Sequence, residues 1–460
     1  MNPTVSGPAE TLHRLYLTLR PEPLLTKDEF STYYRSQVNR VRGMDTVARL
    51  SLKLQQSFGA VPFRTFLMGH PGVGKSTEIT RLLERVKDQH IGIRLSIATE
   101  LNPASFKVFD VLLLMLVRIA EEANSLGVAP LDTDSAALIA DLLQWFGTKK
   151  ESQTRTAGSA ASVDVGIGAK WLEFLGFSVS AKAEAKYAAE RKTETIEHSL
   201  QRLPDLIGLC NRLIDACSRK LREKTGKEWL LIVEDLDKTG ISPQQLQELF
   251  IQYGNVFEEL RVSMIFTIPV WLAYSDDANR LPFERYMIHD TPVFDQGHDA
   301  HVEGRAAVEA VLTARVAPSL FAEGQMTRLI VASGGNLRDL FELVLNAGEG
   351  ALSRDPDAIT IGPDDVTAAI NQERRDYRMK LGQSPYDALP ISYEQKMQKL
   401  VAVYQNSPGN DLPDAALYSL LRARAVQEFN GTGWFGVHPL AVDILRGQQL
   451  LTPDAPGGSS

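Results

Sequence analysis

The chain has 460 residues, enough for two to four domains of ordinary size and for a large hydrophobic core. Hydrophobic residues make up 44% and charged residues 23%, as in soluble globular proteins, which excludes a chain that is disordered throughout. The formal net charge of −8 argues against binding to nucleic acid through overall charge, although a local basic face stays open.

Targeting signals and cysteines both favour the cytoplasm. No run of about 18 apolar residues occurs, so we expect no membrane span. The N-terminus lacks the basic-then-apolar order of a signal peptide. The two cysteines, Cys210 and Cys217, lie seven residues apart in a predicted helix, and we expect them to be core thiols.

Residues 1–40 contain several prolines and few periodic apolar positions. We predict an N-terminal arm there, extended at first and then forming a short helix over Phe30–Val38. A helix from Asp45 onward and a buried strand over Phe63–Met68 then lead into a glycine-rich segment. That segment and the residue after it are Gly69, His70, Pro71, Gly72, Val73, Gly74, Lys75, Ser76 and Thr77.

The glycine-rich segment has the pattern of a phosphate-binding loop, with a strand before it and an amphipathic helix after it. Lys75 is expected to reach the β and γ phosphates of ATP or GTP, and the Ser76 hydroxyl to bind Mg²⁺. Small residues let backbone N–H groups turn toward the phosphates at a helix N-terminus. A chance match is the alternative, and it would arise in about one or two chains of this length per hundred.

Apolar runs at 91–98, 229–233 and 262–268 alternate with predicted helices. This alternation predicts an α/β fold with a parallel sheet covered on both faces, spanning residues 41–295. The long stretch before the 229–233 run predicts an insertion that contains a β-hairpin at about 163–187. Its lysines are suited either to a contact with another molecule or to a solvated surface.

The run Leu230–Asp237 is an apolar strand that ends in acids. A carboxylate at a strand end beside the phosphate loop is placed to hold the metal's water, and a second one to orient the attacking water. Glu234 falls on the metal-binding position and Asp235 on the activating one, although Asp235 is equally able to serve the metal. Glu234 is one methylene longer than the usual aspartate, and if Asp235 serves the metal in its place, we expect slow hydrolysis. A solvated acidic turn is the alternative.

The C-terminal part is predicted to be helical at first. Residues 296–382 read as a small helical lid, and a proline-bearing link follows. Residues 391–450 show two helices and then two apolar runs joined by Asn430-Gly431, a strong hairpin signal, so we predict a winged helix. Residues 451–460 are predicted to be a disordered tail.

These motifs together resemble the AAA+ and STAND branch of P-loop ATPases, near the origin-recognition and Cdc-like initiators and the NACHT or NB-ARC switches. The resemblance extends over most of residues 41–450. Besides the phosphate loop and the acidic strand end, the residues that carry it are Val41-Arg42-Gly43, Thr267 and Gly334-Gly335-Asn336-Leu337-Arg338-Asp339-Leu340.

The resemblance implies roles for several residues. Arg42 and Gly43 would lie at the nucleotide, Thr267 would be the polar sensor near the γ-phosphate, and Arg338 would be the lid arginine that reports the nucleotide state. Arg280 and Arg285 would be candidates for the arginine that enters a neighbouring subunit's site. The alternatives are an ordinary strand threonine for Thr267 and solvated or salt-bridged arginines for the others.

The segment around His438 resembles the Met-His-Asp region of NB-ARC switches, in which a histidine contacts the diphosphate of ADP. His438 would then be a latch that favours a closed ADP form. Valine and proline flank it here, so the match is partial. A structural histidine that caps the last helix is the alternative.

Two functions follow as hypotheses. The first is an ATPase switch with ATP and Mg²⁺ as cofactors, which self-associates and controls a separate effector protein, and the resemblance suggests bacterial antiphage defence as its setting. The second is a DNA-binding ATPase of the initiator or transposition-regulator type. Residues 391–460 carry five basic and six acidic side chains, which disfavours the second. A metabolic kinase is a third class, without a visible acceptor-binding segment.

Overall fold

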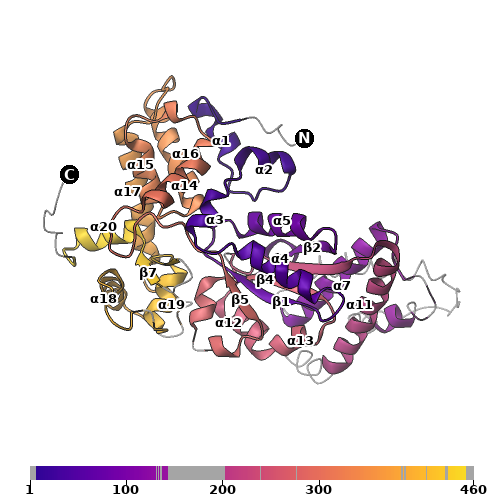
Figure 1. The fold of residues 1–460 in the computed structure, drawn as a ribbon. Helices are drawn as coiled ribbons and strands as arrows, with labels where there is room; N and C mark the ends of the chain where they lie inside the picture. Colours follow the sequence, from indigo (N-terminus) through magenta and orange to yellow (C-terminus); the bar gives the residue numbers. More distant parts are fainter. Residues whose placement is uncertain are drawn as a thin grey trace, which may run out of the picture.

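The computed structural model describes residues 7–130, 203–238, 240–275, 277–384, 390–410, 412–429 and 434–451, together with residues 132, 134, 137–142 and 387. The β-hairpin predicted at 163–187, the Asn430-Gly431 turn and all but the first residue of the predicted tail lie outside the described residues. Figure 1 shows three groups of elements: a sheet with flanking helices, a bundle of helices, and a small C-terminal unit.

A five-stranded parallel sheet forms the centre of the first group, with the strand order β2-β3-β4-β1-β5. The predicted α/β fold with a parallel sheet is therefore confirmed. The strand that precedes the phosphate loop lies beside the last of the predicted strands, and Leu67 pairs with Thr267. The strands are β1 (Arg64–Met68), β2 (His90–Ser96), β3 (Glu228–Glu234), β4 (Ser263–Ile268) and β5 (Glu284–Met287).

Both faces of the sheet are buried, which explains why the strands are continuous apolar runs. Leu67 and Ile232 face a cluster made with α4 (Thr46–Ser57) and α5 (Lys75–Val86). Phe66 and Val233 face the other way, into the large core that also contains α7 (Val108–Ser125) and α11 (Leu203–Thr225). Cys210 and Cys217 are buried in α11, and burial raises the pKa of each thiol to about 12.

Shorter elements complete this group. After β2 comes α6, and after β3 come α12, a π-helical turn and α13, which lead back into β4. Two 3-10 turns then connect β4 to β5. The bounds are α6 (Ile97–Glu100), α12 (Pro243–Gln247), η2 (Glu248–Gln252), α13 (Gly254–Glu259), η3 (Val270–Tyr274) and η4 (Ala278–Arg280).

We call the helical bundle after β5 the lid. It matches the helical pattern predicted for residues 296–382. Its elements are α14 (Val302–Thr313), η5 (Pro318–Leu320), α15 (Gln325–Ala332), α16 (Leu337–Arg354) and α17 (Pro363–Lys380).

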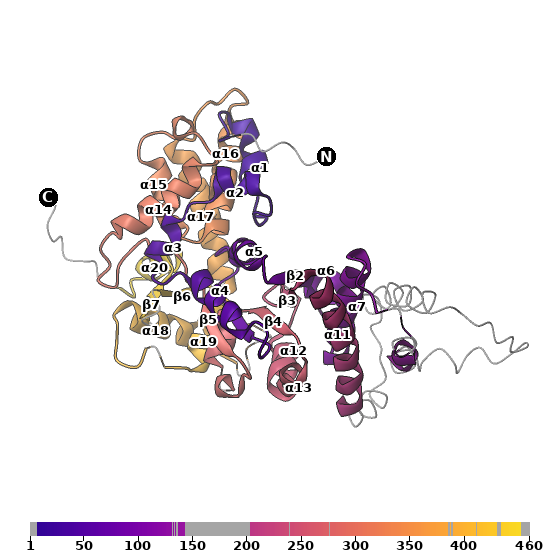
Figure 2. The same cartoon turned by 45° about the vertical axis from the view of Figure 1, so that its right-hand side comes forward.

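The N-terminal arm packs against the lid, as Figures 1 and 2 show. Ala9 exchanges backbone hydrogen bonds with Arg315 and Ala317, and Leu15 lies close to Gly348 of α16. The single helix predicted over Phe30–Val38 is wrong, because residues 34–36 separate two helices. The arm contains η1 (Leu12–Arg14), α1 (Leu15–Thr18), α2 (Lys27–Tyr33) and α3 (Gln37–Val41).

We call the last group the C-terminal unit. Two helices precede an antiparallel pair of strands and a third helix follows it, as expected for a winged helix. Figure 2 shows this unit below the lid, both on the same side of the sheet. Its elements are α18 (Tyr393–Tyr404), α19 (Ala415–Arg422), β6 (Val426–Phe429), β7 (Trp434–Val437) and α20 (Pro439–Gly447).

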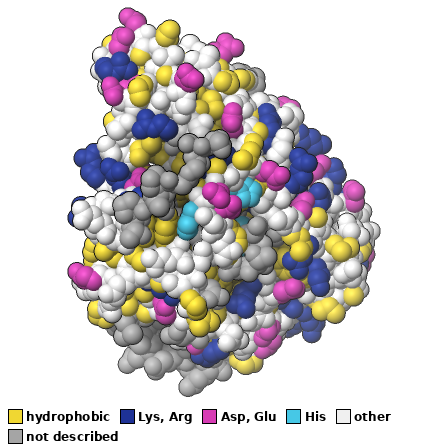
Figure 3. Space-filling view, turned by 60° about the vertical axis from the view of Figure 1, so that its left-hand side comes forward, with side chains coloured by type: hydrophobic (Ala, Val, Ile, Leu, Met, Phe, Trp, Pro, Cys, Tyr) yellow, Lys and Arg dark blue, Asp and Glu magenta, His cyan; other side chains and the backbone are white. Residues whose placement is uncertain are grey.

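The surface of the lid and the C-terminal unit carries mixed charge. On the face that Figure 3 shows, Lys and Arg side chains are interspersed with Asp and Glu, and histidines lie near the centre beside acidic side chains. Among the residues described, no helix has the length and apolar character that crossing a membrane would require.

Candidate nucleotide-binding site

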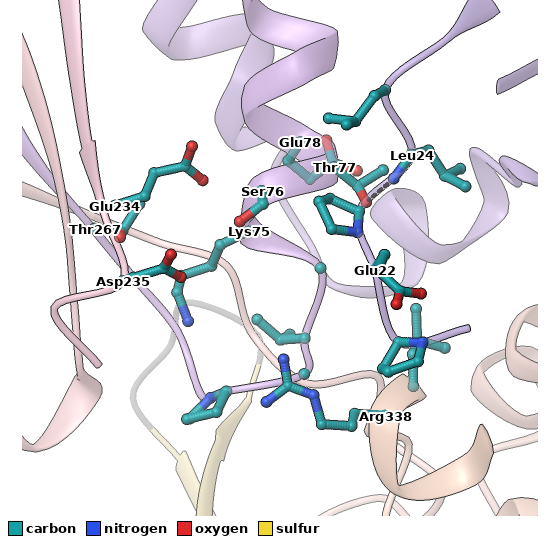
Figure 4. A pocket seen from close by; sticks show the side chains of 18 of the residues that line it. Glu22, Leu24, Lys75, Ser76, Thr77, Glu78, Glu234, Asp235, Thr267 and Arg338 are labelled. Atoms are coloured by element: carbon teal, nitrogen blue, oxygen red, sulfur yellow. Dashed lines mark hydrogen bonds between the residues drawn. The ribbon is translucent and has the colours of Figure 1, made fainter. Parts of the chain in front are cut away.

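A cavity of about 590 Å³ lies where the phosphate loop, the carboxyl ends of β2 and β3, the arm and the lid meet. This volume falls within the range of small-molecule sites. Figure 4 shows Lys75 and Ser76 at the start of α5 with Glu234 and Asp235 of the β3 end beside them. Of the predicted site residues, the cavity is lined by Arg42, Pro71, Gly72, Val73, Gly74, Lys75, Ser76, Thr77, Glu234, Asp235, Thr267 and Arg338.

The phosphate loop has the backbone conformation that anion binding requires. Gly72 and Gly74 have φ values of 90° and 101°, which side-chain-bearing residues rarely adopt. Gly74 is the residue before α5, so the loop ends at a helix N-terminus, whose N–H groups and dipole favour negative charge. Nothing lies within 4 Å of the position that a Cβ of Gly74 would occupy.

Lys75 is buried, and its ammonium contacts Asp237. This aspartate is the last residue of the acidic run after β3, and the sequence predicted no role for it. Lys75 Nζ lies 2.6 Å from Asp237 Oδ2, and only 6% and 7% of the two side chains are exposed. The same nitrogen donates to the carbonyl oxygens of Gly69 and His70 at 2.8 and 3.1 Å. The loop therefore holds its lysine close to its own backbone.

Glu234 accepts a hydrogen bond of 2.5 Å from Arg94 Nε on the neighbouring strand β2. Arg94 also donates to Thr80 Oγ1 of α5 at 3.0 Å, so it ties the acidic strand to the helix after the phosphate loop. The second carboxylate oxygen, Glu234 Oε1, is buried and has no hydrogen-bond partner within the described part of the chain. An unpaired buried acceptor of this kind is ready for a metal-bound water.

Asp235 makes a different contact. Its Oδ2 accepts a hydrogen bond of 2.5 Å from Ser96 Oγ at the end of β2. Asp235 also has a φ of 66°, in the left-handed region that an aspartate tolerates better than most residues. The two acids of the β3 end thus point to different partners, and each partner comes from β2.

The described residues contain no group of three or more His, Cys, Asp and Glu side chains able to hold a metal ion alone. Mg²⁺ characteristically binds through one or two carboxylates or hydroxyls together with substrate phosphates. Ser76 and the unpaired Glu234 Oε1 in one cavity fit that requirement.

Thr267 and Arg338 reach the cavity from opposite sides. Thr267 is buried at the end of β4, between β1 and β3. Arg338 is in the first turn of α16, directly against the phosphate loop, because a Cβ on Gly72 would lie 2.6 Å from Arg338 Cβ.

Arg42 lies inside the protein at the arm side of the cavity. Its Nε donates to Thr291 Oγ1 at 3.1 Å, while Nη2 is buried with no partner among the described residues. Burial lowers the pKa of Arg42, and the charge of Asp290 partly opposes this. Three other residues predicted to contact the nucleotide do not line the cavity: Gly43, Gly69 and His70.

The N-terminal arm crosses the mouth of the cavity, a placement that the sequence did not predict. The backbone N–H of Leu24 donates to Thr77 Oγ1 at 3.2 Å, the dashed line in Figure 4. Further along, Tyr34 Oη donates to Glu78 of α5 at 2.9 Å, and burial raises the pKa of the tyrosine. The arm is therefore bonded to the helix that follows the phosphate loop.

The backbone carbonyl of Pro71 receives donors from both the lid and the C-terminal unit. Asn336 Nδ2 donates to it at 3.0 Å, and Arg424 Nη1 donates to it at 3.4 Å. Arg424 also forms an ion pair of 2.7 Å with Asp339 of α16. One carbonyl of the phosphate loop thus connects all three groups of elements.

His438 lies near this junction but does not line the cavity. The residue precedes α20, and its Nδ1 accepts from the backbone N–H of Leu440, so the neutral ring carries its proton on Nε2. Nε2 lies 3.2 Å from the carbonyl oxygen of Ser333, and the ring stacks on Tyr377. This is the helix-capping placement that the sequence left open as the alternative.

The two arginines considered for a neighbour's site are both outside the cavity. Arg280 pairs with Asp277 at 3.1 Å and is largely exposed, and Arg285 is exposed on the edge strand β5.

Comparisons with known proteins add the following. No protein-family model and no curated protein matches the chain. Among solved structures, it is similar to the Walker-type ATPase of Pyrococcus abyssi, with 13% identity, 93% of this chain and 99% of that chain covered, and a TM-score of 0.41.

Two further solved structures show a weaker similarity. The ORC1 protein of Aeropyrum pernix, solved in complex with DNA, has 12% identity and a TM-score of 0.34, with 88% of this chain and 93% of that one covered. The RuvB Holliday junction branch migration motor of Thermotoga maritima has the same identity and TM-score, with 95% and 100% covered. The assignment of function therefore rests on the geometry of the site.

Proposed function

We propose that this chain is an ATP-binding and ATP-hydrolysing switch that changes the arrangement of its lid and C-terminal unit with the bound nucleotide. The observation that carries the proposal is the Pro71 carbonyl, which accepts from Asn336 of the lid and from Arg424 of the C-terminal unit. A phosphate group that binds in the loop contacts the same backbone segment to which these two side chains are hydrogen-bonded, so its binding can alter both contacts.

Each part of the site has a role in this proposal. Backbone N–H groups of the loop bind the phosphates, Lys75 reaches the β and γ phosphates, and Ser76 and Glu234 hold Mg²⁺. When bound, Mg²⁺ neutralises the charge that develops on the phosphates during transfer. Asp235 orients the attacking water, and Thr267 hydrogen-bonds the γ-phosphate or that water.

Slow turnover follows from the contacts of the acids. Arg94 neutralises Glu234, and the hydroxyl of Ser96 occupies one carboxylate oxygen of Asp235. Both contacts have to rearrange before the acids can serve a metal and a water. Arg338 joins the phosphates from the lid, so the distance between lid and loop reports which nucleotide is bound.

The output of the switch is proposed to be self-association and the control of a separate effector protein, with Arg280 or Arg285 entering a neighbouring subunit's site. Both arginines are exposed and free of the cavity of their own chain. A role in bacterial antiphage defence is the setting that the sequence resemblance suggests.

The test is the native mass of the protein without nucleotide, with ADP, and with a slowly hydrolysed ATP analogue, for wild type and Lys75→Ala. We expect the ATP analogue to raise the mass of the wild type and to leave Lys75→Ala unchanged. Small-angle scattering on the same samples reports a change of shape within one subunit. Unchanged mass and shape in every wild-type sample would refute the switch.

The rival proposal is a DNA-binding ATPase. Arg424, one of the five basic residues in 391–460, pairs with Asp339 at 2.7 Å and only 17% of its side chain is exposed, so little of it is available to DNA. Duplex binding measured from low to high salt separates the two proposals, because contacts to DNA phosphates weaken steeply with salt.

A further inference from the structure

The ammonium of Lys75 has no donor left for a phosphate in this structure. A lysine side chain offers three N–H donors. Asp237 Oδ2, the Gly69 carbonyl and the His70 carbonyl accept them at 2.6, 2.8 and 3.1 Å. A nucleotide phosphate can accept a hydrogen bond from Lys75 only if the lysine first breaks its hydrogen bond to at least one of these acceptors.

Asp237 is the acceptor that a phosphate most resembles. It is the one anion of the three, and a carboxylate and a phosphate compete for an ammonium by the same charge-assisted hydrogen bond. The two backbone carbonyls belong to the loop itself and are neutral. Displacement of Asp237 therefore exchanges one anion for another at Lys75.

The environment keeps Asp237 charged. Burial raises the pKa of its carboxyl group, but the charge of Lys75 and the hydrogen bond from it lower the pKa further, and the net result is below the ordinary value. The more distant Lys238, next in the chain, acts in the same direction. At neutral pH the cavity thus already contains an anion bound to the phosphate-binding lysine.

We propose that Asp237 is a resting counter-ion of Lys75, which a nucleotide has to displace before its phosphates can bind the lysine. This inference rests on the proposed function, because it assumes that nucleotide binds at the phosphate loop. It assigns to Asp237 a new role: the aspartate lowers the affinity for nucleotide by competing with the phosphates for Lys75, without contacting the base or the sugar.

Asp235 supplies a matched control for the proposal. It lies two residues earlier in the same turn and is also an aspartate lining the cavity, but it accepts from Ser96 and not from Lys75. Asp235→Asn removes one negative charge from the same wall and leaves the Lys75–Asp237 pair in place. A general effect of charge would appear in both variants, and the displacement of a counter-ion only in Asp237→Asn.

The experiment measures ADP binding by calorimetry, with EDTA and with Mg²⁺, for wild type, Asp237→Asn and Asp235→Asn. In EDTA we expect Asp237→Asn to bind ADP at least about fivefold more tightly than wild type and Asp235→Asn to stay within about twofold. The melting temperature is measured on the same samples. We expect nucleotide-free Asp237→Asn to melt below wild type and ADP to raise its melting temperature by more than it raises that of wild type.

The outcomes separate the inference from the proposed function. If wild type binds no nucleotide, the proposed function fails, and the inference falls with it. If wild type binds ADP but Asp237→Asn binds it equally or more weakly, Asp237 stays on Lys75 in the bound state and the inference alone is wrong. Equal gains in both variants would likewise overturn it.

Circular dichroism of Asp237→Asn shows whether the variant is folded, and Asp237→Ser repeats the test if it is not.

Discussion

Arg424 of the C-terminal unit and Asp339 of lid helix α16 form a buried ion pair with Nη1 and Oδ1 2.7 Å apart. Burial lowers the pKa of Arg424, but electrostatic interaction with Tyr377 and Asp339 and the hydrogen bond to Asp339 raise it above the ordinary value, so the arginine stays charged. Arg424 holds this position with a φ of 59°, in a region that is unfavourable for an arginine. The pair thus fixes the C-terminal unit to the lid beside the phosphate loop.

We expect Arg424→Met to destabilise the protein by roughly 3–5 kcal/mol, because it leaves the Asp339 carboxylate buried without its cation. The matched control is Arg280→Met, which breaks an exposed pair with Asp277 and should cost at most about 1 kcal/mol. Urea unfolding measures both.

The double variant Arg424→Met, Asp339→Asn tests the cause of this loss. It should recover part of the stability, since no unpaired charge remains. If Arg424→Met is no more harmful than Arg280→Met, the ion pair does not hold the two units together.

Gly335 lies where the turn before α16 of the lid comes close to the segment after β5, so a substitution of Gly335 tests this contact. Its φ is 77°, and a Cβ there would collide with the carbonyl oxygen of Thr291. Gly59 has a φ of 74° with nothing within 4 Å of a Cβ. Alanine at either position destabilises the folded protein by roughly 1–2 kcal/mol because of the left-handed backbone. Only at Gly335 does the added methyl group also collide with a neighbouring backbone atom, so only there must the lid shift.

We therefore expect Gly335→Ala to lower the melting temperature clearly more than Gly59→Ala and to weaken nucleotide binding, which Gly59→Ala leaves intact. Differential scanning calorimetry and ADP binding on the two variants check this. Equal effects would show that the lid turn yields to the extra methyl group without cost.

The strands and the C-terminal helices were predictable because their signals are local. The apolar run that forms β1 follows from the sequence within a few residues, and so do the two helices and two apolar runs of 391–450, which form α18, α19, β6 and β7. The same holds for the phosphate loop, whose function depends on consecutive residues.

The contacts that complete the site were not predictable because they join distant parts of the chain. Arg424 is one of the five basic residues counted in 391–460, and its partner Asp339 precedes it by 85 residues. Leu24 meets Thr77, which is 53 residues later. Asp237 stood in the acidic run, but nothing in the run tells which of its acids faces Lys75.

Stability should fall between about pH 6.5 and pH 4 because of buried histidines. Burial lowers the pKa of His438 to about 4 from the usual 6.5. The unfolded chain therefore binds a proton in this range that the folded protein does not, and stability is lost as the pH falls. For one such histidine the full loss is about 3 kcal/mol. His70, whose pKa burial also lowers to about 4, adds to it.

His438→Asn separates the contribution of this histidine, because asparagine keeps an acceptor for the Leu440 N–H but does not titrate. We expect the variant to lose less stability than wild type between pH 6.5 and pH 4, and His13→Asn, at an exposed position, to behave like wild type. Urea midpoints at a series of pH values provide the measurement. Parallel curves for all three proteins would contradict the role given to burial.

Glu234 decides whether the acidic strand end serves a metal. Glu234→Gln keeps the shape of the side chain and its hydrogen bond from Arg94 but removes the charge that Mg²⁺ requires. We expect Mg²⁺-dependent ATP hydrolysis to fall by at least about tenfold, equivalent to about 1.4 kcal/mol of transition-state stabilisation. ADP binding in EDTA should change little, because the phosphate loop is intact.

Glu100→Gln is the control, because Glu100 lines another wall of the same cavity and pairs with Arg118 at 2.8 Å. Glu100 also accepts from the backbone N–H of Ser96 at the end of β2 at 2.9 Å, and glutamine keeps that acceptor. The variant thus removes a carboxylate while both acids of the β3 end stay in place, and we expect hydrolysis within about twofold of wild type. A titration of Mg²⁺ at fixed ATP completes the test, since Glu234→Gln should need more metal for half-maximal turnover. If Glu234→Gln keeps the metal requirement of wild type, Asp235 is the acid that serves Mg²⁺, and Glu234 acts only as the partner of Arg94.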